Sequence, residues 1–83
     1  MLKLKWIAYD DKVKKLVKKY QLEKQFNKAI DYIRQWRFKT VKLKLRNPKS
    51  KWVWYFRINK QYRAWCRIID DVLIIFDIND HSD

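Results

Sequence analysis

Three arginines, one histidine and two large aromatics near the end of this 83-residue sequence could act together on a phosphate group. Arginine donates forked hydrogen bonds that match phosphate oxygens, and tyrosine or tryptophan stacks on unpaired bases. Histidine is the side chain whose ordinary pKa lies near neutrality, so it is the first candidate for moving a proton. Cleavage of RNA by its own 2′-hydroxyl needs a proton acceptor, a proton donor and positive charge for the developing oxyanion, and no metal. The residues are Tyr55, Arg57, Arg63, Trp65, Arg67 and His81.

These side chains can cooperate only if strands bring them to one face of a sheet. Residues 52–58, 62–69 and 73–79 are rich in aromatic and β-branched residues, which is typical of an antiparallel meander. A three-residue connection at 59–61 collects apolar side chains on one face and keeps the charged ones together on the other. In that register Phe56 pairs with Ala64 and Trp54 with Cys66. The opposite, open face then holds Tyr55, Arg57, Arg63, Trp65 and Arg67.

The alternation of side chains between the two faces also orients the last strand. An odd-length turn at Asp70-Asp71-Val72 would send three of its residues to the core, namely Ile74, Phe76 and Ile78. It would leave on the open face Leu73, Ile75, Asp77, Asn79 and His81. Arg63 would then lie opposite Asn79, with His81 one diagonal step away.

The first half of the chain carries the basic charge. Residues 1–51 hold 17 Lys and Arg against four Asp and Glu, a net +13, whereas residues 52–83 have a net charge of −1. A domain this basic usually has a polyanion as its partner, such as nucleic acid, an anionic membrane or an acidic protein segment. Alternation over residues 41–46 predicts a short strand whose cationic face adds three RNA-binding candidates, Lys42, Lys44 and Arg46.

Further elements must position this meander. Alternation of apolar and cationic residues over 2–6 predicts a half-buried strand, and helical spacing predicts two amphipathic helices over about 11–20 and 22–37. Asp10 or Asp11 could be the N-cap of the first helix. We therefore expect an α+β fold in one domain, residues 1–83. An N-terminal strand and a two-helix hairpin would accompany a mostly antiparallel sheet of four or five strands, with the hairpin packed on one face.

Composition excludes several classes of protein. A chain this short, with no glycine, cannot build a dinucleotide-binding loop or a P-loop. The single Cys66 cannot form an internal disulfide, and one histidine cannot make a structural metal cluster. No apolar run approaches the roughly 18 residues of a spanning helix, and the Lys-rich start is unlike a signal peptide. We expect a cytoplasmic protein without metal, cofactor or membrane partner.

The layout and two motifs resemble the RelE/ParE toxin superfamily. Residues 56–63 read Phe-Arg-Ile-Asn-Lys-Gln-Tyr-Arg, similar to the HigB branch, and residues 79–83 read Asn-Asp-His-Ser-Asp, similar to the YafQ branch. Members are small basic toxins of toxin–antitoxin pairs, and most known ones cleave mRNA in the ribosomal A site. The resemblance implies a RelE-like fold, an endoribonuclease that acts on mRNA and the ribosome, and a small antitoxin with an acidic segment as partner.

The resemblance also implies roles for individual residues. By position, Arg63 stabilises the phosphate in the transition state, His81 transfers a proton and Arg57 contributes to RNA binding. Where RelE itself carries lysines on the strand before the hairpin, this sequence has Val53 and Tyr55. Two other functions stay open: a ParE-like inhibitor of DNA gyrase, and a noncatalytic protein that binds RNA or the ribosome.

Overall fold

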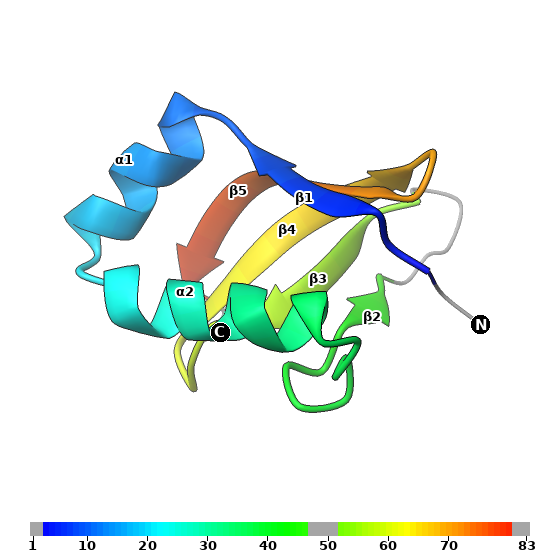
Figure 1. Ribbon diagram of the computed structural model, residues 1–83. Helices are drawn as coiled ribbons and strands as arrows, with labels where there is room; N and C mark the ends of the chain where they lie inside the picture. The colour runs from blue at the N-terminus through cyan, green and yellow to red at the C-terminus, as the bar shows by residue number, and fades with distance from the viewer. Residues whose placement is uncertain (1–2, 47–51, 81–83) are drawn as a thin grey trace.

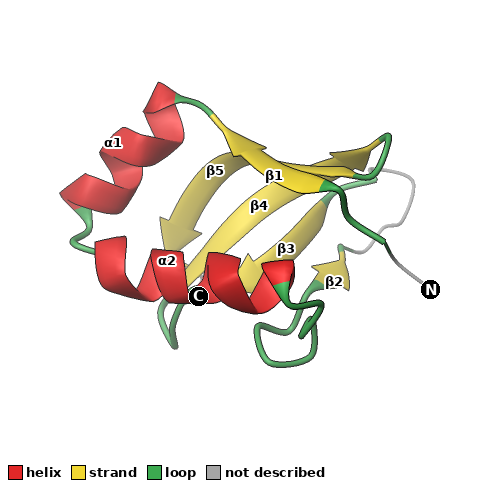
Figure 2. Ribbon diagram, viewed as in Figure 1, coloured by secondary structure: helices red, strands yellow, loops and turns green. Residues whose placement is uncertain are grey.

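The computed structural model describes residues 3–46 and 52–80, in which two helices cover one face of a five-stranded sheet (Figure 1). In chain order the elements are β1 Trp6–Tyr9, α1 Asp11–Lys19, α2 Glu23–Arg34, β2 Lys44–Leu45, β3 Trp54–Arg57, β4 Tyr62–Ile69 and β5 Val72–Asp80. The strand order across the sheet is β1-β5-β4-β3-β2. Figure 2 shows both helices on the same side of the strands. The predicted α+β class, with a helical hairpin on one face, is confirmed.

The two helices begin and end close to where the sequence predicts. The carboxylate of Asp10 caps α1 because it accepts a hydrogen bond from the Val13 amide at 3.1 Å. Each helix is closed by a residue in the left-handed region, Gln21 with φ 56° and Trp36 with φ 61°. In both cases the two amides after the helix donate to carbonyls in its last turn, a Schellman motif made without glycine. Neither helix is long and apolar enough to cross a membrane.

An apolar core lies between the helices and the sheet. Its largest fully buried side chains include Phe56, Ile33, Leu73, Ile75 and Ile78. Burying a side chain of this size contributes about 1.5–3 kcal/mol. No polar or charged residue among those described is buried. Arg57, Arg63 and Trp65 alternate with core residues along β3 and β4, so their side chains project from the face away from the helices.

The N-terminal strand begins later than the alternation over residues 2–6 predicts. β1 runs parallel to β5, with Trp6 paired to Val72 and Tyr9 to Ile75. β1 therefore consists of the residues that pair with β5, and the Leu/Lys alternation before Trp6 does not extend it. The other three strand pairings are antiparallel, so the sheet is mixed.

The short basic strand is also shorter than predicted. Only Lys44 and Leu45 form β2, because hydrogen bonds from Lys42 to Lys39 and from Leu43 to Phe38 fold the preceding residues into turns. Lys42 itself has φ 55°. The prediction that it shares a strand face with Lys44 is therefore wrong. The predicted turn at 47–50 lies outside the described residues.

The first hairpin of the meander has the predicted register. The side-chain oxygen of Asn59 accepts hydrogen bonds from the amides of Gln61 and Tyr62, both at 2.8 Å, which stabilises a three-residue connection. Phe56 pairs with Ala64, and Trp54 pairs with Cys66. The separation of a core face from an open face on β3 and β4 is confirmed.

The second hairpin departs from prediction twice. Its turn has two residues, Asp70 and Asp71, both with positive φ, as a hairpin turn of this length requires. A β-bulge then places Phe76 as an extra residue, because Trp65 pairs with Asp77 while the next residue, Cys66, pairs with Ile75. The predicted facing is therefore wrong over residues 73–76. Leu73 and Ile75 lie in the core, whereas Ile74 is half-buried and Phe76 is exposed.

The two departures cancel beyond the bulge. The turn and the bulge each switch which face the following residues of β5 point to. After both, Ile78 lies in the core as predicted and Asn79 pairs with Arg63. Asn79 thus lies opposite Arg63, as the sequence predicts, although the turn and the bulge before it differ from the prediction.

Candidate nucleic-acid interface

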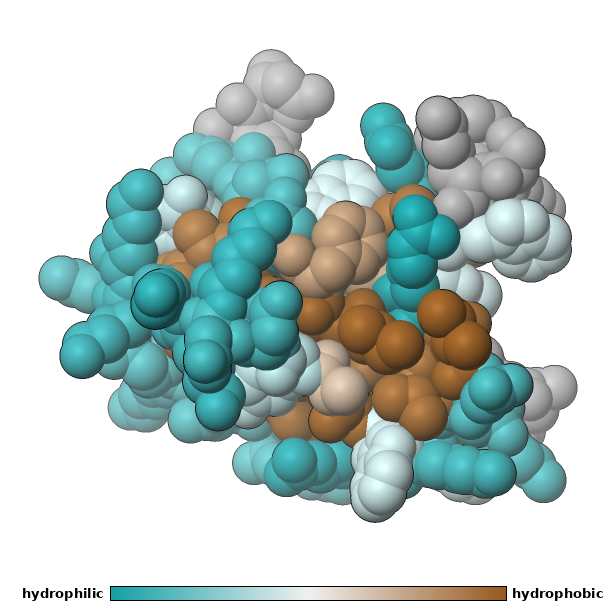
Figure 3. Space-filling view, turned by 90° about the horizontal axis from the view of Figure 1, so that it is seen from above, coloured by the Kyte–Doolittle hydropathy of each residue, from teal (hydrophilic) through white to brown (hydrophobic). Residues whose placement is uncertain are grey.

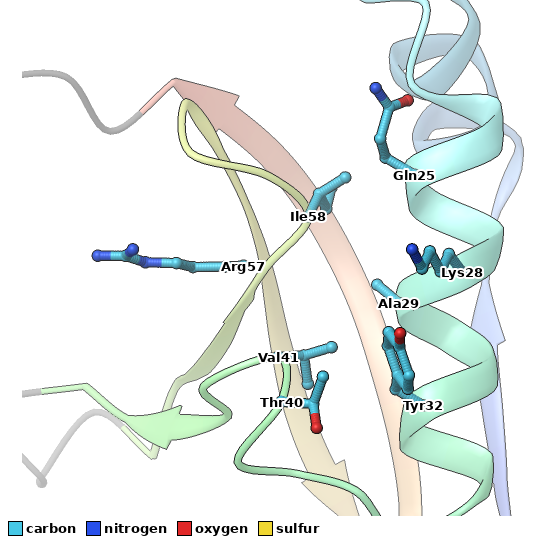
Figure 4. Close-up of a pocket in the computed structure, with 8 residues that line it drawn as sticks. All are labelled: Gln25, Lys28, Ala29, Tyr32, Thr40, Val41, Arg57 and Ile58. Atoms are coloured by element: carbon cyan, nitrogen blue, oxygen red, sulfur yellow. The ribbon is translucent and has the colours of Figure 1, made fainter.

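The sheet face away from the helices, here called the open face, carries the predicted site residues in neighbouring rows. In one row Arg57, Arg63 and Asn79 are paired across three strands. In the next row Lys44, Tyr55, Trp65 and Asp77 are paired across four. Residues two apart on one strand are separated by about 6.6 Å, so the rows are neighbours. Figure 4 shows the Arg57 side chain pointing away from α2 and from the other residues drawn there.

Arg63 is held on the open face by an aromatic ring. Its guanidinium carbon lies 4.7 Å from the centroid of the Tyr55 ring, within cation–π range. Its Nε is buried and, among residues 3–46 and 52–80, has no hydrogen-bond partner. A buried donor without a partner is uncommon in proteins and calls for an explanation. Arginine donors match the oxygens of a phosphate, which makes Arg63 a candidate to contact one.

The three ion pairs found within the described residues do not include the arginines of the open face. Within the described part of the chain, the ion pairs join Lys12 to Asp77, Lys14 to Asp11 and Arg34 to Asp31. Asp77 lies one row from Arg63, but its ion pair is with Lys12, at 3.9 Å. The partner of Arg63 across the strands is the neutral Asn79. These three ion pairs therefore leave the positive charge of Arg57 and Arg63 uncompensated.

Two aromatic side chains form a platform beside this charge. The rings of Tyr55 and Trp65 lie 5.2 Å apart, and the guanidinium carbon of Arg46 lies 5.5 Å from the Trp65 ring. The indole Nε1 of Trp65 donates to Oδ1 of Asn79 at 2.8 Å, which fixes the orientation of both side chains. The structure thus brings together the predicted residues Tyr55, Trp65 and Arg46.

An open depression of about 350 Å³ lies beside Trp65 and Asn79 on the open face. Seven residues line it, namely Arg46, Val53, Trp65, Arg67, Phe76, Asp77 and Asn79. The guanidinium carbon of Arg67 lies 5.9 Å from the Phe76 ring. Alternation along the last strand predicts Phe76 as a core residue, so the sequence does not identify it as part of this depression. The sequence does place Asp77 on the open face, but only as a carboxylate that could pair with Arg63, and not as a ligand-binding residue.

The other predicted site residues do not all lie on the open face. Arg67 and Lys44 lie on the open face, and Lys42 lies in the turn that precedes β2. His81, the predicted proton-transfer residue, lies outside the described residues. The described residues hold no group of three or more His, Cys, Asp or Glu side chains that could bind a metal ion.

Cys66 lies beneath the site, on the core face of β4. Its side chain is fully buried, and burial raises the pKa of the thiol above its ordinary value. The thiol therefore stays protonated at neutral pH and cannot act as a nucleophile. Its prediction as a small core residue is confirmed.

No protein-family model matches the chain, and no curated protein matches it either. The chemistry of the open face must therefore carry any inference about what the protein does.

Proposed function

We propose that this chain is a RelE-like toxin of a type II toxin–antitoxin pair, which cleaves mRNA on the ribosome in the cytoplasm without a metal ion. The observation that carries the proposal is the guanidinium of Arg63, stacked on Tyr55 with its buried Nε unpartnered among the described residues. Arg57 is its partner in register. Two neighbouring guanidinium groups without a described carboxylate partner suit a phosphate, because arginine donors match phosphate oxygens.

The proposed reaction uses the RNA's own nucleophile. The 2′-oxygen of one nucleotide bonds to the adjacent phosphorus, and the bond from that phosphorus to the 5′-oxygen of the next nucleotide breaks. One fragment ends in a 2′,3′-cyclic phosphate and the other begins with a 5′-hydroxyl. One proton leaves the 2′-hydroxyl and one joins the 5′-oxygen, and we assign one of these transfers to His81. Arg63 stabilises the charge that develops on the nonbridging phosphate oxygens.

The neighbouring aromatics support a single-stranded substrate. Stacking of an unpaired base on tyrosine or tryptophan contributes about 1–3 kcal/mol, and it is available only when the base is not stacked in a duplex. Tyr55 and Trp65 lie in the row next to the two arginines, so bases could stack while a phosphate is bound. The formal net charge of +12 would add long-range attraction to RNA and the ribosome.

An exposed apolar area supports the antitoxin as partner. Trp6 is 71 % exposed and Ile69 is 52 % exposed, and both flank Val72 in the register of the sheet. Figure 3, which views the molecule from above, shows a continuous apolar area bordered by hydrophilic side chains. Such an area on a strongly basic chain suits a partner that combines apolar side chains with acidic ones.

Induced expression tests the proposal. We expect the wild-type chain to arrest growth and fragment mRNA, and Arg63→Ala to do neither. Arg37→Ala is the matched control, because Arg37 is stacked on Tyr32 at 5.2 Å, a contact of the same kind outside the open face. Growth arrest with intact mRNA and a DNA-damage response would instead favour a gyrase inhibitor. Harmless expression of folded protein would favour a noncatalytic RNA-binding protein.

A further inference from the structure

We propose that the depression on the open face is a nucleobase subsite selective for guanine, in which the Asp77 carboxylate determines the selectivity. The proposal deepens the proposed function and rests on it in taking RNA as the ligand. Trp65 and Asp77 form the row next to Arg63 and Asn79. Because the two rows are about 6.6 Å apart, a base in the depression and a phosphate on Arg63 can belong to one strand of RNA.

The depression has the size and the walls that a base requires. Its volume of about 350 Å³ lies within the range of roughly 300–1,000 Å³ that is typical of ligand sites. Trp65 and Phe76 supply aromatic surface, and each is accompanied by a guanidinium, from Arg46 and Arg67 respectively. Aromatic rings and guanidinium planes both stack on the faces of unpaired bases. The β-bulge contributes here directly, because it turns Phe76 away from the core.

The polar atoms in the depression are oriented by contacts within the chain. Oδ1 of Asn79 accepts from Trp65, so its amide nitrogen remains as a donor toward a ligand. Oδ1 of Asp77 accepts from the Ile78 amide at 2.9 Å and lies 3.9 Å from Nζ of Lys12. Among the described residues both polar contacts of Asp77 go to Oδ1. Oδ2 therefore remains as an acceptor on a side chain that is 37 % exposed.

A carboxylate distinguishes guanine from the other three bases by its Watson–Crick edge. Guanine presents two adjacent donors, N1–H and N2–H, which a carboxylate accepts together. Adenine and cytosine each present an amino donor beside a ring nitrogen acceptor, and uracil presents one N–H between two carbonyls. An acceptor next to the carboxylate is repelled by it. Guanine O6 would then face donors, and the amide of Asn79 and the guanidinium of Arg67 are both in the lining.

Binding of four trinucleotides tests this proposal without relying on cleavage. The probes are single-stranded RNAs that differ only in the central base, UGU, UAU, UCU and UUU, titrated into the purified chain. A bidentate contact to a base discriminates by about 1–3 kcal/mol, so we expect UGU to bind at least about fivefold more tightly than the others. Asp77→Asn replaces one acceptor by a donor and should reduce the preference to less than about threefold.

Matched variants exclude an indirect effect. Asp11→Asn removes a carboxylate that also lies 3.9 Å from a lysine, Lys14, but on α1. This variant should keep the preference for UGU. Asp77→Ala should lose it as Asp77→Asn does, with circular dichroism showing that both variants are folded. A second acidic-to-neutral change, Asp71→Asn in the turn between β4 and β5, should also keep the preference.

The outcomes separate this proposal from the proposed function. Equal binding of the four RNAs by the wild type, no binding of any of them, or an unchanged preference in Asp77→Asn would overturn the guanine subsite. A preference for UGU that Asp77→Asn removes would support the subsite even if the chain never cuts mRNA. Cleavage of mRNA with no base preference would support the endoribonuclease and refute the subsite.

Discussion

The guanidinium carbon of Arg63 lies 4.7 Å from the centroid of the Tyr55 ring and links the two rows of the open face. Strand arginines are often held by carboxylates, which neutralise them. An aromatic ring orients a guanidinium and leaves its charge and donors available, since it accepts no conventional hydrogen bond from them. Such a contact contributes about 0.5–1 kcal/mol when exposed and about 2 kcal/mol or more when desolvated. Tyr55 thus orients Arg63 without neutralising its charge.

Replacement of Tyr55 should separate the role of its ring from that of its hydroxyl. Tyr55→Phe keeps the ring under Arg63 and should retain RNA cleavage within about twofold. Tyr55→Leu removes the ring, and we expect cleavage to fall roughly tenfold, because a contact of about 1.4 kcal/mol corresponds to that factor. Rates of cleavage by purified variants measure this. Equal activity of Tyr55→Leu and wild type would show that the stacking does not position Arg63.

Salt dependence should reveal the contact between Arg57 and phosphate. The logarithm of affinity falls linearly with the logarithm of salt concentration, with a slope of about −0.7 for each phosphate of a single strand that is neutralised. Arg57→Ala should therefore make the slope shallower by about 0.7. Fluorescence anisotropy of a labelled single-stranded RNA over a range of salt measures it. Lys24→Ala, on α2, should leave the slope unchanged, and an equal change in both variants would contradict a specific role for Arg57.

The Arg63–Asn79 pairing shows how far sequence reasoning reaches and where it stops. Apolar alternation predicts the faces of β3 and β4 because one of them must be buried. Alternation does not predict the bulge at Phe76, since the extra residue is specified by the local backbone and by packing against neighbouring strands. The two-residue turn cannot be recognised from the sequence, because the chain lacks glycine and uses Asp70 and Asp71 at positive φ. The two errors cancel, so the row containing Arg63 was predictable and the depression beside it was not.

Glycine at a left-handed helix end should stabilise the fold. Gln21 has φ 56°, a conformation in which a Cβ atom costs roughly 1–2 kcal/mol, partly offset by the greater backbone entropy that glycine loses on folding. Gln21→Gly should therefore raise the free energy of unfolding by about 1 kcal/mol. Urea denaturation followed by circular dichroism measures it. Gln21→Ala retains the Cβ atom and should give no such gain, and equal effects of the two substitutions would refute the explanation.

The single thiol should report on the integrity of the core. Burial raises the pKa of Cys66, so the native thiol stays protonated even above the pH at which a free thiol ionises. A thiol reagent should react slowly with the native chain across this pH range and rapidly once denaturant unfolds it. The unfolded thiol ionises at the lower pH, so raising the pH above its ordinary pKa should favour unfolding. Fast labelling of the native chain would contradict a closed core beneath the open face.

Cleavage of a defined mRNA on purified, programmed ribosomes tests the central claim most directly. Wild-type chain should produce fragments that end in a 2′,3′-cyclic phosphate and begin with a 5′-hydroxyl. Arg63→Lys keeps the charge but loses the forked donors, and we expect its rate to fall about 100-fold or more without a change in melting temperature. Arg63→Ala should be at least as impaired. Cleavage by folded Arg63→Ala at the wild-type rate would contradict the account.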